Sequence, residues 1–213
     1  MARKIVFNTY DTATKGWTLN SCELTAPEYV QRFVSVPWRD GAVDFSDANG
    51  EVSYNSRTLT ARLECSEGTR TERLALVSDM INQLDGKNVS ITLPDRTGYA
   101  LVGRLSIAEE YNTPYQCAVI VTAVCGPWFT KNTETTKTVT ATSTLQTVTI
   151  TNAGRRAVVP KIVNTAAVHL ELGSGSVDLT AGTHYAFTFP SGDNVLKYKG
   201  SGTVTVSFKE AIL

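Results

Sequence analysis

Residues 58–65 read Thr-Leu-Thr-Ala-Arg-Leu-Glu-Cys, and the class of fold follows from this short run. Its odd positions are apolar and its even positions are polar, which is the period of a strand with one buried face. A second period comes soon after it, with apolar residues every three or four positions on one helical face: Leu74, Val77, Ile81 and Leu84. We therefore expect a sheet with one open face, covered by a single helix.

The helix is predicted from about Thr69 to Asp85. Ser66 or Thr69 can cap its start because a hydroxyl oxygen there accepts a hydrogen bond from a free backbone N–H. Gly86 is well placed to end it, since glycine readily adopts the left-handed conformation that follows a helix.

Further strands are predicted after this helix. Val89, Ile91 and Leu93 alternate with polar residues, and the turn-rich sequence 94–98 leads into a strand over 99–105. A loop that holds Glu109 and Glu110 is expected next. The run 115–125 is apolar enough for a central strand that is covered on both faces.

The chain is predicted to divide near residue 130. Residues 130–144 contain eight threonines, so 130–145 reads as a threonine-rich linker or as a first strand. The alternation changes phase near Leu145 and Gln146, where we expect a bulge or turn. Residues 146–213 have the pattern of a small β-sandwich, with short apolar runs separated by glycine, serine and asparagine: 158–163, 168–172, 185–189 and 203–208.

Composition and charge exclude several classes of protein. The 213 residues are 42% hydrophobic, which favours a globular core, and the formal net charge is zero. Residues 1–129 hold 12 basic and 15 acidic residues, whereas 130–213 hold 8 and 5. Such small imbalances argue against specific nucleic-acid binding. We expect no membrane insertion and no signal segment, because the apolar runs are too short, and therefore folding in the cytoplasm.

The residues that usually carry chemistry are scattered. The four cysteines lack the spacing of a zinc site, and we expect them to be reduced and structural. The two histidines accompany no nucleophile motif and no set of metal ligands, so we expect no catalytic residue, no metal and no cofactor. Adjacent carboxylates at Glu109 and Glu110 point to opposite sides of an extended chain, which disfavours glycoside hydrolysis. The four cysteines are Cys22, Cys65, Cys117 and Cys125, and the two histidines are His169 and His184.

The tryptophans of the first part are the candidate interface. Trp17, Trp38 and Trp128 all lie before residue 130, and Trp38 is followed by Arg39 and Asp40 in a turn-rich segment. Tryptophan and arginine are frequent anchors of protein interfaces. The candidate set is Trp38, Arg39, Asp40 and Trp17, although a Trp38 folded over its own core fits the sequence equally well.

Several motifs follow one another along the chain: Trp17-Thr18-Leu19, the segment 36–44, the predicted helix, the segment 98–104, Cys125-Gly126-Pro127-Trp128-Phe129 and the final segment 202–213. In this order they resemble the distal tail protein family of long-tailed bacteriophages (siphophages), and the resemblance covers almost the whole chain. One position departs from the pattern, because Trp38 stands where many relatives have a small residue such as glycine.

This resemblance implies a mainly β protein in two domains. Residues 1–129 would form a β-sandwich or barrel-like domain with one helix, which assembles into a hexameric ring at the tail tip of the virion. Residues 146–213 would form a β-sandwich similar to galectins or carbohydrate-binding modules. The ring would join the tail tube protein to baseplate or receptor-binding proteins, without enzymatic activity. The alternative is a carbohydrate-binding adhesion module that contacts host glycans weakly; a cell-wall hydrolase that uses Glu109 or Glu110 ranks third.

Overall fold

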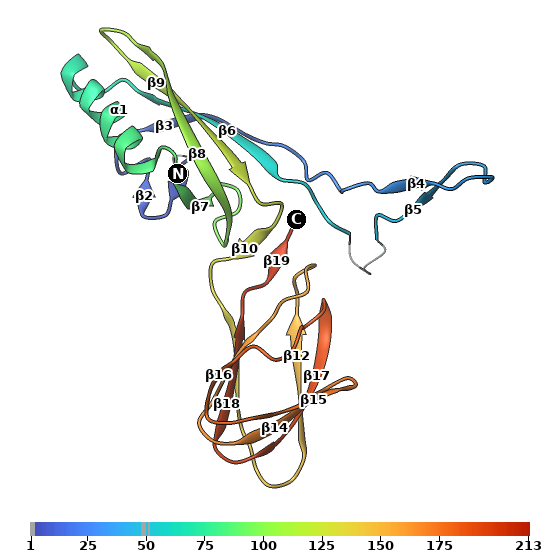
Figure 1. Cartoon of the computed structure of the whole chain (residues 1–213). Helices are drawn as coiled ribbons and strands as arrows, with labels where there is room; N and C mark the ends of the chain where they lie inside the picture. The colour runs from blue at the N-terminus through green and yellow to red at the C-terminus, as the bar shows by residue number, and fades with distance from the viewer. Residues whose placement is uncertain (1–2, 48–49, 51) are drawn as a thin grey trace. The chain divides into compact units, whose positions relative to one another are not determined.

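The computed structural model describes residues 3–47, 50 and 52–213, and the chain forms two compact units (Figure 1). The first unit is Met1–Phe129 and the second is Thr130–Leu213. Strands dominate both units, and the described residues contain one α-helix. The prediction of a mainly β protein with a single helix is confirmed.

The first unit is built on an antiparallel sheet with the strand order β2-β1-β7-β8-β9-β6-β3. Residues at odd positions of β6, which lies between β9 and β3, are buried, as its alternation predicted. Leu59 lies opposite Ala123 of β9, and Leu63 lies opposite Val119. The strands are β1 (Val6–Phe7), β2 (Tyr10–Asp11), β3 (Thr18–Leu24), β6 (Arg57–Cys65), β7 (Asn88–Thr92), β8 (Tyr99–Asn112) and β9 (Cys117–Cys125).

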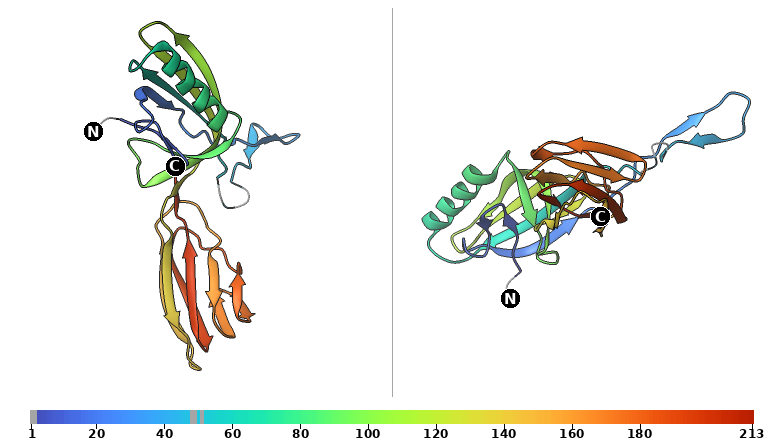
Figure 2. Two further views of the ribbon diagram at one scale, coloured as in Figure 1. Left: turned by 90° about the vertical axis from the view of Figure 1, so that its left-hand side faces the viewer. Right: turned by 90° about the horizontal axis from the view of Figure 1, so that it is seen from below.

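Helix α1 (Arg70–Leu84) contacts β8 and β9 and lies across one face of this sheet (Figure 2). Thr69 caps its start: the Thr69 side chain accepts from the backbone N–H of Glu72, and the Glu72 carboxylate accepts from the backbone N–H of Thr69 at 2.7 Å. Gly86 follows the helix with φ of 70°. The predicted boundaries therefore agree with the structure to within one residue.

The buried face of α1 differs from the predicted stripe. Val77 and Leu84 are buried as expected, but Leu74 is 43% exposed and Ile81 is only partly buried. Arg73 and Met80 occupy the face instead. Arg73 reaches the core because its guanidinium donates to backbone carbonyls, to Gly68 at 2.6 Å and to Pro114 at 2.5 Å. A search for apolar residues alone does not find such a buried arginine.

Strand β8 is longer than predicted. Glu109 and Glu110 were expected in a loop, but they lie inside β8, where a β-bulge separates Glu109 from Tyr111. The Glu110 carboxylate accepts from Arg62 Nε of β6 at 2.6 Å. Backbone pairing with β9 keeps this acidic stretch extended, since Glu109 lies opposite Val119 and Tyr111 lies opposite Ala118.

A separate hairpin completes the first unit. Strands β4 (Phe33–Ser35) and β5 (Ala42–Asp44) pair with each other in an antiparallel ribbon, and Figure 1 shows this ribbon extending away from the main sheet. Strand β10 (Phe129–Lys131) then leads into the second unit.

The second unit is a β-sandwich of two four-stranded sheets, β11-β18-β13-β16 and β12-β17-β14-β15. Buried side chains from both sheets form its core, where Phe189 and Phe208 meet edge to face with ring centroids 5.8 Å apart. The strands of these two sheets are β11 (Thr135–Thr140), β12 (Gln146–Asn152), β13 (Lys161–Asn164), β14 (Val168–Leu172), β15 (Gly175–Leu179), β16 (Gly182–His184), β17 (Gly192–Gly200) and β18 (Thr203–Phe208). The final strand, β19 (Ala211–Ile212), lies outside both sheets and pairs with β10.

Two predicted strands of this unit differ in the structure. Residues 185–189 form no regular strand, and only Phe189 makes an isolated bridge, with Val158. The run 158–163 is shortened to a strand that begins at Lys161, because Pro160 has no backbone N–H to donate to a hydrogen bond between strands. The threonine-rich segment contains β11, which pairs with β18 along its whole length. The likeness of the sandwich to galectins stays a prediction.

Candidate functional site

The β4–β5 hairpin exposes apolar side chains on both of its faces. Phe33 and Val34 are neighbours on β4, so their side chains point to opposite faces, and both are exposed. Val36 and Phe45 are exposed beside them. A two-stranded hairpin is only marginally stable alone in water. We call the segment 32–46 the arm, and its apolar surface is of the kind that another molecule covers.

Trp38 lies at the tip of the arm and is fully exposed. Its φ is 67°, in the left-handed region that a bulky residue seldom adopts. The backbone N–H of Arg39 donates to the Val36 carbonyl at 3.3 Å and closes the turn. Arg39 and Asp40 are exposed next to it. Three of the four predicted interface residues are therefore together on the arm, and Trp38 does not fold back over its own core.

The fourth candidate, Trp17, lies elsewhere. Its side chain is 2% exposed, and its Nε1 donates to the Tyr10 hydroxyl at 3.2 Å in the core of the first unit. Trp17 directly precedes β3, and its ring packs in the core of the first unit at the start of that strand. It has no surface to offer a partner and is removed from the candidate interface.

A hollow lies at the base of the arm, with a volume of 550 Å³. Two chain segments frame it through backbone hydrogen bonds, from Val30 N–H to Ser53 O and from Asn55 N–H to Glu28 O, each at 2.8 Å. The ring of Tyr54 packs edge to face on Trp128, 5.4 Å away, which ties this base to the first unit. The hollow is lined by Pro27, Glu28, Tyr29, Gln31 and Asn55.

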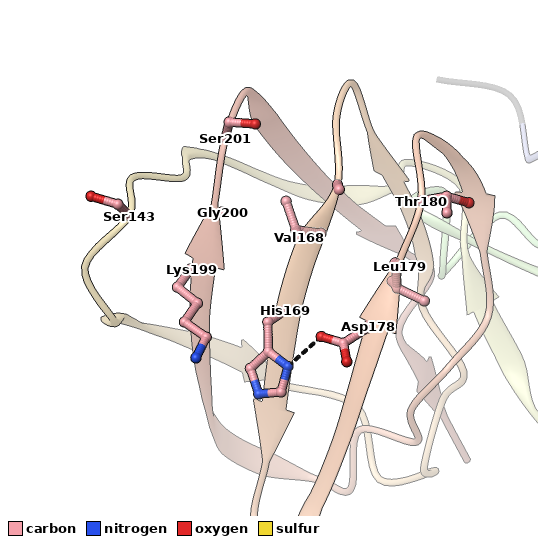
Figure 3. Close-up of a pocket in the computed structure, with 10 residues that line it drawn as sticks. Ser143, Val168, His169, Asp178, Leu179, Thr180, Lys199, Gly200 and Ser201 are labelled. Carbon is pink, nitrogen blue, oxygen red and sulfur yellow. Dashed lines mark hydrogen bonds and ion pairs between the residues drawn. The ribbon is translucent and has the colours of Figure 1, made fainter.

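The second unit carries a pocket of 580 Å³ on the sheet that contains β14, β15 and β17 (Figure 3). His169 of β14 is its most prominent polar group. Nδ1 of His169 lies 2.6 Å from Asp178 Oδ1, and Nε2 lies 3.3 Å from Glu171 Oε1. Lys199, opposite His169 on β17, lines the pocket with the apolar residues Ala167, Val168 and Leu179 and the polar residues Ser143, Thr180 and Ser201.

This geometry does not match a catalytic triad. The base of a triad directs Nε2 at the nucleophilic hydroxyl, whereas Nε2 of His169 faces a carboxylate. Figure 3 shows Ser143 and Ser201 on loops at the end of the sheet, away from the imidazole ring. Nε2 of His184 donates to the Thr180 carbonyl, 2.8 Å away. Both histidines therefore contact neighbouring residues of the second unit, and their structural role stays a prediction.

The cysteines of the described chain are free thiols, and three of them are buried. Burial raises the pKa of the Cys125 thiol to about 11 because the apolar surroundings disfavour a thiolate. Among the described residues there is no cluster of three potential metal ligands. In the same part of the chain, no helix is long and apolar enough to cross a membrane.

Sequence reasoning missed the apolar body of the arm and the hollow at its base. A signal for the arm was present, because adjacent apolar residues such as Phe33 and Val34 cannot both face one core. The hollow left no comparable signal. Its lining comes from residues 27–31 and 55, and only the folded chain brings these together.

Comparisons with known proteins bear on the fold. No protein-family model and no curated protein matches the chain. Among solved structures, the chain is similar to the Dit protein (gp 19.1) of SPP1, described as a paradigm of the hub adsorption apparatus in phages that infect Gram-positive bacteria. That match has 16% identity and a TM-score of 0.72, and covers 98% of this chain and 99% of that one.

A second match is to a structure of the phage P2 baseplate in its activated conformation with Ca, at 10% identity and a TM-score of 0.49. It covers 99% of this chain and 98% of that one. The first match is the informative one, and it shows that the chain has the fold of the Dit protein along nearly its whole length.

Proposed function

We propose that this chain is a distal tail protein, a structural and non-enzymatic subunit of a phage tail tip. The observation that carries the proposal is the Dit fold, which extends over almost all of both chains. The order of motifs in the sequence supports the same family. The protein would be located in the virion at the tail tip and would be assembled in the host cytoplasm.

Self-association is the central part of this function. We propose a ring of six copies, closed by surfaces of the first unit, which joins the tail tube protein to baseplate or receptor-binding proteins. The arm supports this proposal because its exposed apolar residues need a partner, and a repeated head-to-tail contact can close into a ring. Trp38, Arg39 and Asp40 are the residues proposed for the interface.

The mass of the full-length protein in solution tests the ring. Native mass spectrometry should give six times the chain mass of 23.1 kDa, and negative-stain images should show closed rings. A species of 23.1 kDa at the highest soluble concentration would contradict self-association. A closed ring with another number of copies would contradict only the hexamer.

A second candidate function is binding of a host glycan by the second unit. The pocket around His169 favours it, since its hydroxyl and charged side chains border an apolar floor. Glycan-array binding by the full-length protein would support this function if it is lost in Lys199→Ala. Lys161→Ala, an exposed lysine of the other sheet, is the matched control and should leave binding unchanged. An array without signal would exclude the glycans tested.

A further inference from the structure

The tip of the arm and the hollow at its base are complementary, yet they belong to different places on one chain. The tip presents the indole of Trp38, which is fully exposed. The hollow offers Pro27 and Tyr29, whose rings can pack on an indole. Its volume of 550 Å³ lies within the range of about 300–1,000 Å³ that is typical of ligand pockets.

A chain cannot fill its own hollow with its own Trp38. Strand β4 leads away from the base, and an extended chain rises about 3.3 Å per residue. The pairing of Phe33 with Asp44 and of Ser35 with Ala42 holds the two strands together up to the turn, and Figure 1 shows the ribbon extending away from the main sheet. The tip of one chain can therefore reach only the hollow of another molecule.

The charges beside these two surfaces are also complementary. Arg39 follows Trp38 at the tip, and Glu28 lies in the wall of the hollow. Neither side chain forms an ion pair with another described residue. An indole seated against Tyr29 would bring the guanidinium of Arg39 close to this carboxylate. Opposite charges at a rim set the register of a contact.

From these observations we infer that Trp38 of one copy inserts into the hollow formed by Pro27, Glu28, Tyr29, Gln31 and Asn55 of a second copy. The inference rests on the proposed self-association and names the two surfaces that make it. The contact is heterologous, because each copy gives a tip and receives a tip. The left-handed φ of Trp38 serves this contact by directing the indole outward from the turn.

Complementation between two variants tests this inference. Trp38→Ala removes the tip and keeps the hollow, whereas Tyr29→Ala removes a wall of the hollow and keeps the tip. Both side chains are exposed, so neither change should alter the fold, which circular dichroism would check. Each variant alone should remain at 23.1 kDa, and an equimolar mixture should form a species of twice that mass and nothing larger.

A mixture that stays monomeric would overturn the inference, as would a Tyr29→Ala protein that assembles like the unaltered chain. In either case a ring formed by the unaltered protein would leave the proposed function standing. If the unaltered protein is itself monomeric, the proposed function falls together with the inference.

A charge exchange provides a second test that does not depend on removing aromatic rings. Arg39→Glu and Glu28→Arg should each weaken self-association at least tenfold, and the double variant should recover most of that loss. Asp47→Arg, an exposed acidic residue outside both surfaces, is the control for net charge. Failure of the double variant to recover assembly would show that these two charges do not meet.

Discussion

Gly103 of β8 lies directly opposite Cys125 of β9, and the thiol of Cys125 occupies the space that a side chain on residue 103 would need. A Cβ on residue 103 would lie 2.6 Å from Cys125 Sγ and 3.0 Å from the carbonyl oxygen of Val124. This close contact lies on the buried face of the sheet, since Cys125 and Leu105, two residues after Gly103 on β8, are both buried. Glycine at 103 is therefore a packing requirement of the first unit.

Gly103→Ala should lower the free energy of unfolding by about 1–3 kcal/mol, because the sheet must shift to admit a methyl group. Chemical denaturation would measure it. Gly98→Ala is the matched control, since a Cβ there meets no atom within 4 Å. Adding Cys125→Ala to Gly103→Ala should recover part of the loss. Strictly additive effects of the two changes would show that the thiol is not the obstacle.

The helix offers a comparison between two apolar residues. Met80→Ala should cost about 2–5 kcal/mol because Met80 is fully buried on the face of α1 that packs on the sheet. Leu74→Ala should change stability by less than about 0.5 kcal/mol, since Leu74 lies on the exposed side. Thermal and denaturant unfolding would give the free energy of unfolding of each variant for comparison with that of the unaltered protein. Equal losses would mean that the helix buries a different face.

The side chain at position 38 should affect the stability of the isolated chain and its self-association in opposite directions. Glycine adopts a φ of 67° without steric strain. Trp38→Gly should therefore stabilise the isolated chain by up to about 1 kcal/mol while it weakens self-association. Trp38→Ala keeps a Cβ and hence the backbone strain, so it should weaken association without the gain in stability. Unfolding measured at monomeric concentrations separates the two effects. A destabilised Trp38→Gly protein would show that the indole supports the fold of its own arm.

Much of this architecture could be predicted because local patterns govern it. The alternation in β6 and the capping residues of α1 act within a few residues of each other, so the sequence exposes them directly. The burial of Arg73 could not be predicted, because it depends on carbonyls of Thr113 and Pro114 about forty residues away. Trp17 is a different case, because the Tyr10 hydroxyl that accepts from its indole N–H is near it in sequence, but only the folded chain shows that the two are buried together.

The candidate site was predictable only at its tip. Trp38, Arg39 and Asp40 stand out as an aromatic and charged group within a turn. The hollow depends on backbone pairing between Glu28 and Asn55, which are separated by the whole arm. Pairing over that distance follows from the tertiary fold, and no short motif encodes it.

Alkaline pH should destabilise the first unit through Cys125. Its folded-state pKa of about 11 exceeds the ordinary value of 9.0, so the unfolded chain loses this proton first. The stabilising contribution is complete below pH 9 and disappears as pH rises towards 11, by about 2–3 kcal/mol for a difference of two units. Urea unfolding at a series of pH values would follow this loss. Cys125→Ala should show a shallower decline, and identical slopes would exclude the thiol as the cause.

The last prediction concerns nucleic acid. The ring that we propose would have to let DNA pass without retaining it, so its inner surface should be acidic or neutral, because clustered Lys and Arg bind phosphates strongly. The first 129 residues carry more acidic than basic side chains. Arg57 is buried, where its Nε donates to the Thr25 carbonyl at 2.8 Å, so it adds little charge to any surface. Arg32 and Arg39 belong to the arm, which we assign to contacts between copies.

Full-length protein should therefore pass through a duplex-DNA column at moderate salt without retention. A variant with Thr58→Lys and Thr60→Lys is the control: it adds two cations per copy at exposed positions of β6, on the face away from the helix, and should be retained if the column detects such charge. Retention of the unaltered protein that weakens as salt rises would contradict the prediction, because it would place clustered cations within reach of the DNA.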